Sequence, residues 1–189
     1  AIALHPDMEY SAVKTDKFDV LIMASELVEN VMKASGVNEY KTLAVFKGEM
    51  LEGMKACHPL YERDSLIINA PFVTLDTGSG CVHIAPGHGE EDYEIGKQYG
   101  LEVYAPVDND GRFTKDVEGF AGQFVFDANP NVNKALAEKG ALLNEDKYSH
   151  SYPYCWRCKS PIIFRSTWQW FISMEHDGLR EKALKAIDK

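Results

Sequence analysis

Two histidines and a group of carboxylates lie within one glycine-rich stretch, Gly78–Tyr93, which reads GSGCVHIAPGHGEEDY. Glycine permits positive φ angles and close approach of the backbone to a ligand. Pro86 excludes a helix that would place His83 and His88 on one face. The polar side chains of this stretch are therefore expected on turns.

The spacing of the glycines and histidines can be compared with the spacing that a dinucleotide-binding loop or a zinc site requires. A dinucleotide-binding loop would need a third glycine and a following helix, whereas Gly78 and Gly80 lead into an apolar run typical of a strand. A zinc site built from His83, His88 and Asp92 would lack the i, i+4 histidine pair of a helical zinc motif. Neither of these sites is favoured by the pattern.

The same stretch resembles the signature of the editing domain that is inserted in bacterial-type isoleucyl-tRNA synthetases. A second block, His150–Arg165, reads HSYPYCWRCKSPIIFR and resembles the segment by which that insertion returns to the synthetic core. The resemblance covers essentially the whole chain. It implies hydrolysis of the ester that links valine to the 3′ end of tRNA(Ile), with the tRNA acceptor end and the synthetic core of the same polypeptide as partners.

The resemblance also implies roles for single residues. Asp92 matches the aspartate that anchors the α-ammonium group of the substrate. His83 matches the editing histidine and is expected to form the pocket wall and a polar contact with the substrate, with general-base action as an alternative. Further substrate contacts, including backbone N–H groups for an oxyanion, are expected from Gly78, Ser79, Gly80, Ala85, Pro86, Gly87, His88 and Gly89.

The chain departs from the family pattern in two places. Ser79 stands where the family usually has threonine, which keeps the hydroxyl group. A threonine-rich strand that lines the editing pocket in the family precedes the segment resembling Ala1–Asp7, so we expect this chain by itself to hydrolyse its substrate poorly.

Cys155 and Cys158 have the spacing of half a zinc knuckle, and tetrahedral zinc needs four ligands. In many relatives a second such pair lies upstream of the insertion, so we expect a half-site here whose partners lie outside the chain. A thioredoxin-like redox pair is the competing interpretation, but the strand-to-helix context of such a pair is missing. Editing itself needs no cofactor, and ATP and magnesium would belong to the synthetic core.

Two other functions remain alternatives. The editing domain of valyl-tRNA synthetase shares the fold, but those relatives usually carry lysine at the position of His83. A catalytically silent module that binds zinc and the tRNA acceptor end is the other alternative. Hydrolysis assays separate the two classes, because a silent module would release no amino acid.

The composition limits the classes of protein to which the chain can belong. The formal net charge of −9 disfavours indiscriminate nucleic-acid binding, because phosphate contacts need clustered lysine and arginine. No apolar run has the length of a membrane span, and four cysteines form no disulfide framework in a chain of 189 residues. These features predict a cytoplasmic protein without a membrane partner.

The pattern of elements predicts mixed α/β content: a mainly β domain with peripheral helices, closed or nearly closed into a barrel. A hairpin is expected from Glu9–Lys14 and Phe18–Met23, followed by a helix capped by Ser25 and ended by Gly36. Other expected elements are strands at 42–46, 66–73 (with Pro71 at an edge or bulge) and 101–107, a helix at 90–99, a turn at 108–111 and a helix that starts at Pro130 and ends at Gly140.

The C-terminal part of the chain differs in character, because aromatic residues crowd it before a final amphipathic helix. We therefore predict an editing domain at residues 1–149 and, at residues 150–189, a stem that packs on a synthetic core.

Overall fold

The structure is a computed structural model of the chain that describes residues 1–147, 149 and 151–187. One three-stranded antiparallel sheet has the order β3-β2-β4, with β2 at Glu9–Thr15, β3 at Val20–Ala24 and β4 at Tyr40–Lys47. The predicted hairpin is confirmed, because β2 pairs with β3 from Tyr10 opposite Ala24 to Lys14 opposite Val20.

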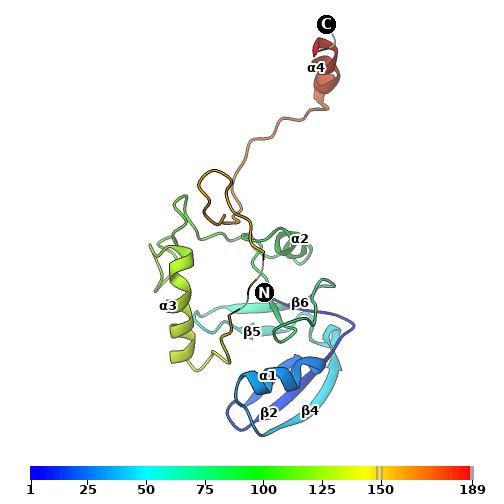
Figure 1. Cartoon of the computed structure of the whole chain (residues 1–189). Coiled ribbons are helices and arrows are strands. Elements are labelled where there is room, and N and C mark those ends of the chain that lie inside the picture. The colour runs from blue at the N-terminus through cyan, green and yellow to red at the C-terminus, as the bar shows by residue number, and fades with distance from the viewer. Residues whose placement is uncertain (148, 150, 188–189) are drawn as a thin grey trace.

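Helix α1, Val28–Ala34, covers one face of this sheet after a 3-10 turn at Ser25–Leu27 (Figure 1). Val13 and Met23 of the sheet pack against Val28 and Met32 of the helix. The predicted cap is wrong, since the Ser25 hydroxyl forms no capping bond and instead lies 2.8 Å from the hydroxyl of Ser11 on β2. The Ser25 hydroxyl therefore hydrogen-bonds to the neighbouring strand β2 and not to the backbone of the helix.

A second, four-stranded sheet has the order β5-β6-β1-β7. Its strands are β1 at Ile2–Leu4, β5 at Lys55–Cys57, β6 at Asp64–Asn69 and β7 at Val82–His83. Strand β1 runs parallel to β6 and antiparallel to β7. The 3-10 turn η2, Gly48–Leu51, connects β4 to this sheet.

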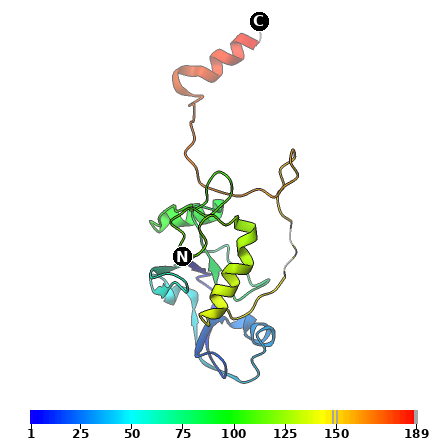
Figure 2. The ribbon, with the colours of Figure 1, turned by 90° about the vertical axis from the view of Figure 1, so that its left-hand side faces the viewer.

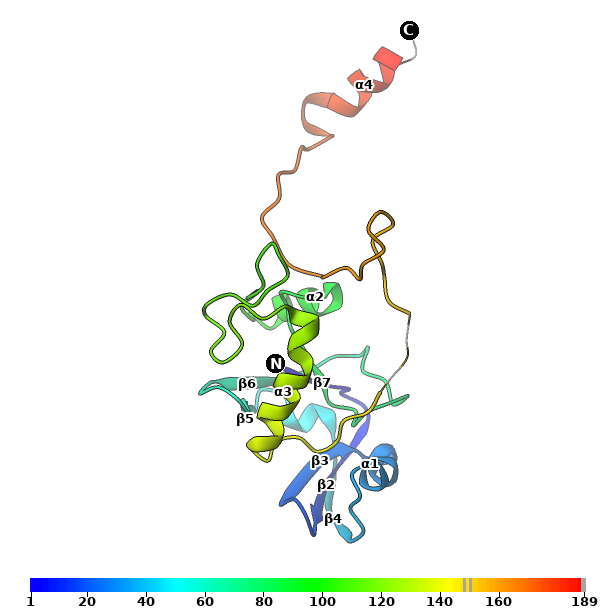
Figure 3. The same cartoon turned by 60° about the vertical axis from the view of Figure 1, so that its left-hand side comes forward.

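Helix α2, Glu90–Gln98, packs on one face of the second sheet through Ile95, which joins Ala3, Ile68 and Ile84 in a buried cluster. The predicted helix at 90–99 is confirmed, and Gly100 follows it with a φ of +64°. Figure 3 shows β7 and the N-terminus beside β6, with α2 next to them.

The mixed α/β content is confirmed, whereas the described residues form two separate sheets and no closed barrel. Strands β1 and β7, with three and two residues, are too short to carry pairing around a closed sheet. The predicted strand at 66–73 is shorter and earlier than expected and ends at Asn69, before Pro71.

The predicted strand at 101–107 is wrong. Only Val107 forms an isolated bridge, to Phe113, and the backbone bonds of this segment close locally, as from the Val107 N–H to the Ala105 carbonyl at 2.9 Å. The turn at 108–111 is confirmed, because the Asp108 carboxylate accepts the N–H of Asp110 and of Arg112.

Helix α3, Val125–Glu138, begins five residues earlier than predicted, so that Pro130 lies inside it. A proline in the second turn removes one intrahelical hydrogen bond without ending the helix. Gly140 follows the helix with a φ of +67°, as predicted.

Beyond residue 151 the chain is mostly extended, and the turn η3, His176–Gly178, and helix α4, Leu179–Ile187, lie away from the two sheets (Figures 1 and 2). The predicted start of the stem falls on His150, which lies outside the described residues. The two-part division therefore stays a prediction. None of the described helices has the length and apolar character to cross a membrane.

Candidate functional site

The first part of the glycine-rich stretch is fixed to the three-stranded sheet. The Ala24 N–H donates to the Ser79 carbonyl at 2.8 Å, and the buried Tyr10 hydroxyl donates to the Gly80 carbonyl at 2.7 Å. Gly80 has a φ of +74°, and a Cβ atom on it would lie 2.5 Å from the Cβ of Ala24. Only glycine fits this position, which links the two sheets.

His83 stands on β7 directly opposite Ile2, and its side chain is exposed at the surface of the sheet. Burial by the protein around the ring nevertheless lowers its pKa, while the Asp92 carboxylate acts in the opposite direction. The net effect favours a neutral imidazole at neutral pH. Such a ring can donate one hydrogen bond and accept another.

Asp92 lies in the first turn of α2, where the helix dipole stabilises a negative charge. Its Oδ2 accepts the N–H of Ala85 at 2.9 Å and so holds the strand end of the loop against the helix. Gly89 is close by, since a Cβ on it would lie 3.1 Å from the Asp92 Cγ. The second oxygen, Oδ1, has no hydrogen-bond partner within the described part of the chain and is available to a ligand.

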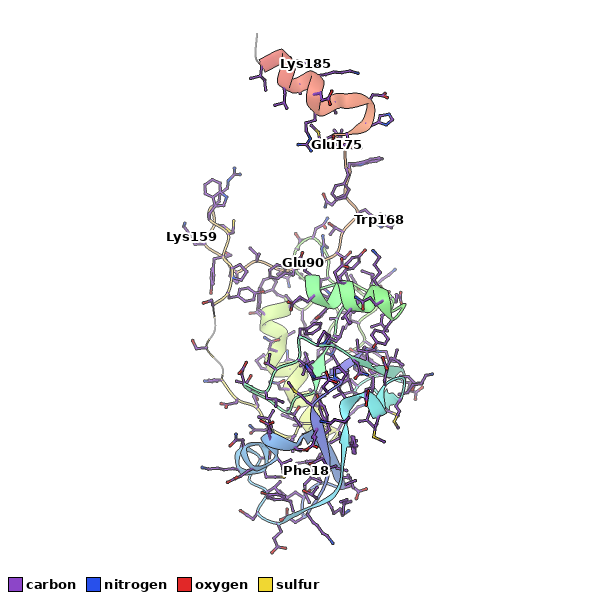
Figure 4. The ribbon with its side chains drawn as sticks, turned by 90° about the vertical axis from the view of Figure 1, so that its right-hand side faces the viewer. Phe18, Glu90, Lys159, Trp168, Glu175 and Lys185 are labelled. Carbon is purple, nitrogen blue, oxygen red and sulfur yellow. The ribbon has the colours of Figure 1, made fainter. Side chains whose placement is uncertain are left out.

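The residues that follow Ala85 face a different surface. The Gly87 carbonyl accepts the N–H of Ser166 at 2.8 Å, and the Nδ1 of His88 lies 2.9 Å from the Phe164 carbonyl. A groove of ≈ 350 Å³ lies there, and Figure 4 shows Glu90 below the extended segment that bears Trp168. The groove is lined by Pro86, Gly87, His88, Gly89, Glu90, Tyr93, Phe164, Arg165, Ser166, Thr167 and Gln169.

The structure thus divides the predicted site residues. His83, Ala85 and Asp92 lie together at the end of the second sheet, Ser79 and Gly80 are bonded to the first sheet, and residues 86–89 line the groove. Gly78 stands free of close packing, because a Cβ atom on it would have no neighbouring atom within 4 Å.

Few backbone donors of the predicted oxyanion set remain available. The Ala85 N–H is bonded to Asp92, and the His88 N–H is bonded to the Ala85 carbonyl at 2.8 Å. Pro86 has no N–H at all. Within residues 85–89, the N–H groups of Gly87 and Gly89 are therefore the two that have no partner among the described residues.

Cys155 and Cys158 lie on a tight loop of the C-terminal segment. The Lys159 N–H donates to the Cys155 carbonyl at 2.9 Å, and Lys159 itself has a φ of 58°. Hydrogen bonds from the Ser160 backbone and hydroxyl, and from Cys155, lower the pKa of Cys158 and favour its thiolate.

No third histidine, cysteine, aspartate or glutamate joins the two cysteines in the described parts of the chain. Cys57 is exposed on β5, and burial raises the pKa of Cys81 to about 11. Two thiolates do not make a closed tetrahedral zinc site.

Two further residues near the site, His58 and Arg63, flank the loop between β5 and β6 and were not predicted. Arg63 acts electrostatically on His83 and on His58, which places the two histidines near one another. In the sequence, His58 stands out only as part of a His-Pro break between strands. His58 could have been identified only by recognising that β5 and β6 form a short hairpin in the sheet that also contains β7.

Comparisons with known proteins give a consistent result. A family model described as leucyl-tRNA synthetase, editing domain, matches residues 22–152. Isoleucine–tRNA ligase of Desulfovibrio desulfuricans is 53% identical over 189 residues, which are 100% of this chain and 20% of the relative. The ligase of the same name from Thermoanaerobacter sp. is 54% identical over 187 residues, which are 99% of this chain and again 20% of the relative.

A solved structure described as "The crystal structure of GlLeuRS-CP1" superposes with a TM-score of 0.60 at 18% identity and covers 78% of each chain. At this identity the likeness bears on the fold alone. The chain spans about a fifth of the length of the curated relatives that it matches.

Proposed function

The chain belongs to the family of leucyl-tRNA synthetase editing domains, and on this premise we propose that it removes valine from mischarged tRNA(Ile) by hydrolysing the aminoacyl ester. The observation that carries the choice of tRNA is the identity of 53% and 54%, over nearly the whole chain, to proteins named isoleucine–tRNA ligase. The rest of the longer protein would supply the synthetic site with its ATP and magnesium.

The need for such a site has a physical basis. One methylene group in an apolar pocket is worth only about 1–3 kcal/mol, a figure for which this synthetase family is itself the standard example. A synthetic pocket that accepts isoleucine therefore also accepts some valine. A second site that admits valine and excludes isoleucine removes the error after it is made.

Asp92 would bind the α-ammonium group of the valyl ester. Its Oδ2 is held by the Ala85 N–H at 2.9 Å, so the direction of Oδ1 is fixed before the substrate arrives. An oriented carboxylate binds an ammonium group by a charge-assisted hydrogen bond. Fixing the ester in one pose lowers the entropy cost of attack by water.

His83 would limit the size of the substrate side chain and contact the ester. Its lowered pKa supports the neutral ring in this role, because a neutral imidazole does not repel the substrate ammonium group that Asp92 holds. Of the two free N–H groups, that of Gly89 is the candidate for contact with the ester oxyanion, because Gly89 lies against the Asp92 carboxyl group, whereas Gly87 lies against Tyr104 and Ala105.

The two thiols of Cys155 and Cys158 do not by themselves fit a four-coordinate zinc ion, and no step of hydrolysis is assigned to a metal. We propose that they are one half of a site in the longer protein. Metal analysis of the 189-residue chain is then expected to find well under one tightly bound zinc per chain. One tightly held zinc per chain would contradict the half-site.

The proposal is tested by assaying the full-length synthetase against valyl-tRNA(Ile) and isoleucyl-tRNA(Ile). The parent enzyme is expected to hydrolyse the valyl ester and spare the isoleucyl ester. His83→Ala is expected to enlarge the pocket, so that the variant begins to hydrolyse isoleucyl-tRNA(Ile) or loses its preference for valine. Aminoacylation serves as the control, because the synthetic site is elsewhere.

Release of no amino acid by the parent enzyme would instead support a silent module that only binds the acceptor end. Preference for threonyl-tRNA(Val) would support an editing domain of the valyl type.

A further inference from the structure

The hairpin between β5 and β6 brings a histidine and an arginine together at its open end. Cys57 opposes Asp64 in the last pair of the two strands. The next pair in this ladder is His58 and Arg63, which are joined by a hydrogen bond from the His58 N–H to the Arg63 carbonyl at 2.9 Å. Residues that oppose each other in a ladder share one face of the sheet, so these two side chains lie side by side.

That face is the one that carries His83. Arg63 precedes Ile67 by four residues, and side chains alternate between faces, so both point to the same side. Ile67 opposes Ile2, and Ile2 opposes His83. The register therefore places His58, Arg63 and His83 on one face of the sheet. Helix α2 packs on the other face through Ile95, while the Asp92 carboxylate of its first turn reaches the strand end at Ala85, two residues from His83.

The loop fixes the ring of His58 in one tautomer. Its Nδ1 accepts the N–H of Leu60 at 3.1 Å and of Tyr61 at 3.2 Å, so the proton of the neutral ring is on Nε2. This Nε2–H has no acceptor in the described part of the chain. The loop is itself held from outside, because the Tyr61 hydroxyl donates to the Glu118 carbonyl at 2.9 Å.

The charge of Arg63 is also left uncompensated. The neighbouring Asp64 points to the other face, where it forms an ion pair with Lys55 at 3.1 Å. Arg63 takes part in no ion pair among the described residues. After burial, the guanidinium of Arg63 is a cause of the lowered pKa of His58, and it also contributes to the lowered pKa of His83.

We propose that Arg63 and His58 bind a backbone phosphate next to the 3′-terminal nucleotide of the aminoacylated RNA, on the face where His83 contacts the ester. A guanidinium presents a planar fork of donors that matches phosphate oxygens, and the imidazole Nε2–H adds a further donor. In a chain of net charge −9, one uncompensated arginine beside the site gives a local attraction for the RNA. This inference rests on the proposed function and names the part of the substrate that these residues hold.

The test compares two esters that differ in phosphate. Valyl-tRNA(Ile) carries the phosphate and 3′-O-valyl-adenosine does not, and both are offered to the full-length synthetase with Arg63 or with Arg63→Gln. The variant is expected to raise the KM for valyl-tRNA(Ile) by about fivefold to tenfold. The factor by which Arg63→Gln lowers kcat/KM should be about fivefold or more larger for valyl-tRNA(Ile) than for valyl-adenosine. Equal losses on both esters, or no loss, would overturn the proposal.

Lys41→Gln is the matched control, because it removes one exposed positive charge from β4 in the other sheet. Lys41→Gln should change neither the KM for valyl-tRNA(Ile) nor the ratio of kcat/KM between the two esters. Arg63→Lys is expected to recover part of the loss, since it restores the charge without the planar fork.

Binding of uncharged tRNA(Ile) gives a readout that does not depend on hydrolysis. The slope of log K against log salt concentration should be smaller by about 0.7 in Arg63→Gln, as for one lost contact to a single strand. An unchanged slope would contradict the phosphate contact. If the parent enzyme hydrolyses neither ester, the proposed function fails, and this slope still decides on the phosphate contact. If it hydrolyses both and Arg63→Gln behaves like the parent, only the phosphate contact fails.

Discussion

The glycine-rich stretch and the C-terminal segment differ in how far the chain itself satisfies their side chains. In the stretch around Gly80 and Asp92, carbonyls, N–H groups and a carboxylate oxygen find partners on both sheets and on α2. In the C-terminal segment Trp168 and Trp170 are fully exposed, and Figure 4 shows Trp168 and Lys159 on segments that project from the body. The first region is built within the chain, whereas the second offers apolar surface that the described residues do not cover.

This difference supports the prediction that the second region packs on another part of a longer protein. Exposed tryptophan of this extent costs free energy in water, and a large exposed apolar surface marks an interaction site. The relatives are about five times longer than this chain, so they contain other surfaces that could cover it. The identity of that surface stays a prediction.

The largest expected effect is on the link between the two sheets. Gly80→Ala would place a Cβ 2.5 Å from the Cβ of Ala24 and keep a φ of +74°. We expect it to lower the free energy of unfolding by about 3 kcal/mol, from overpacking together with the strained backbone. Urea denaturation of the 189-residue chain measures this change.

Gly78→Ala is the matched control for that substitution. Gly78 has a φ of +76°, but nothing lies within 4 Å of its Cβ position. Its expected cost is about 1 kcal/mol, from the backbone alone. If the two variants are equally stable, the close approach at Gly80 does not stabilise the fold.

The stability of the 189-residue chain is expected to depend on pH. Burial lowers the pKa of both His58 and His83 in the folded chain, whereas a histidine in the unfolded chain has a pKa of about 6.5. Below about pH 6.5 the unfolded chain therefore binds protons that the folded chain does not, and the free energy of unfolding falls as the pH falls. Urea denaturation at a series of pH values from about 7.5 to about 5 measures this slope.

Replacing both histidines by glutamine is expected to flatten the slope in that range. His176→Gln, which changes an exposed histidine of the C-terminal segment, is the control and should leave the slope as it is. A double variant with the slope of the parent chain would show that neither histidine is desolvated by folding.

The smallest effect is expected in the C-terminal segment. Trp168→Ser removes a fully exposed side chain, so the free energy of unfolding of the 189-residue chain should change by less than about 0.5 kcal/mol. In the full-length protein the same substitution should be clearly destabilising, because the ring would there be buried. Equal effects in the two proteins would contradict the prediction that this segment packs on the rest of the protein.

Local signals in the sequence predict much of the fold. The β2–β3 hairpin, α2 and the glycines after the helices are predicted correctly, because alternation, first-turn carboxylates and C-terminal glycines act over a few residues. The start of α3 is missed because proline favours the first turn of a helix, whereas Pro130 lies in the second turn. Closure of the sheets depends on pairing between distant segments, which no local pattern specifies.

The arrangement of the candidate site can be predicted from the sequence only in part, for the same reason. His83 and Asp92 can be found from a continuous stretch, but the contact of Asp92 with Ala85 and the separate exposure of residues 86–89 depend on how that stretch folds. His58 and Arg63 precede His83 by many residues in sequence and meet its face only through the register of four strands. A non-local register of this kind cannot be read from residue types alone.

The proposed function depends most on the Asp92 carboxylate, which would bind the substrate ammonium group. Asp92→Asn tests this role most directly, because the amide oxygen can still accept the Ala85 N–H while the charge is removed. A charge-assisted hydrogen bond contributes roughly 1.5–3 kcal/mol, so kcat/KM for deacylation of valyl-tRNA(Ile) by the full-length synthetase should fall at least about tenfold. Aminoacylation with isoleucine should be unchanged. If Asp92→Asn and Asp92→Ala both deacylate valyl-tRNA(Ile) at the rate of the parent enzyme, the assignment is contradicted, and Glu90 or Glu91 becomes the next candidate.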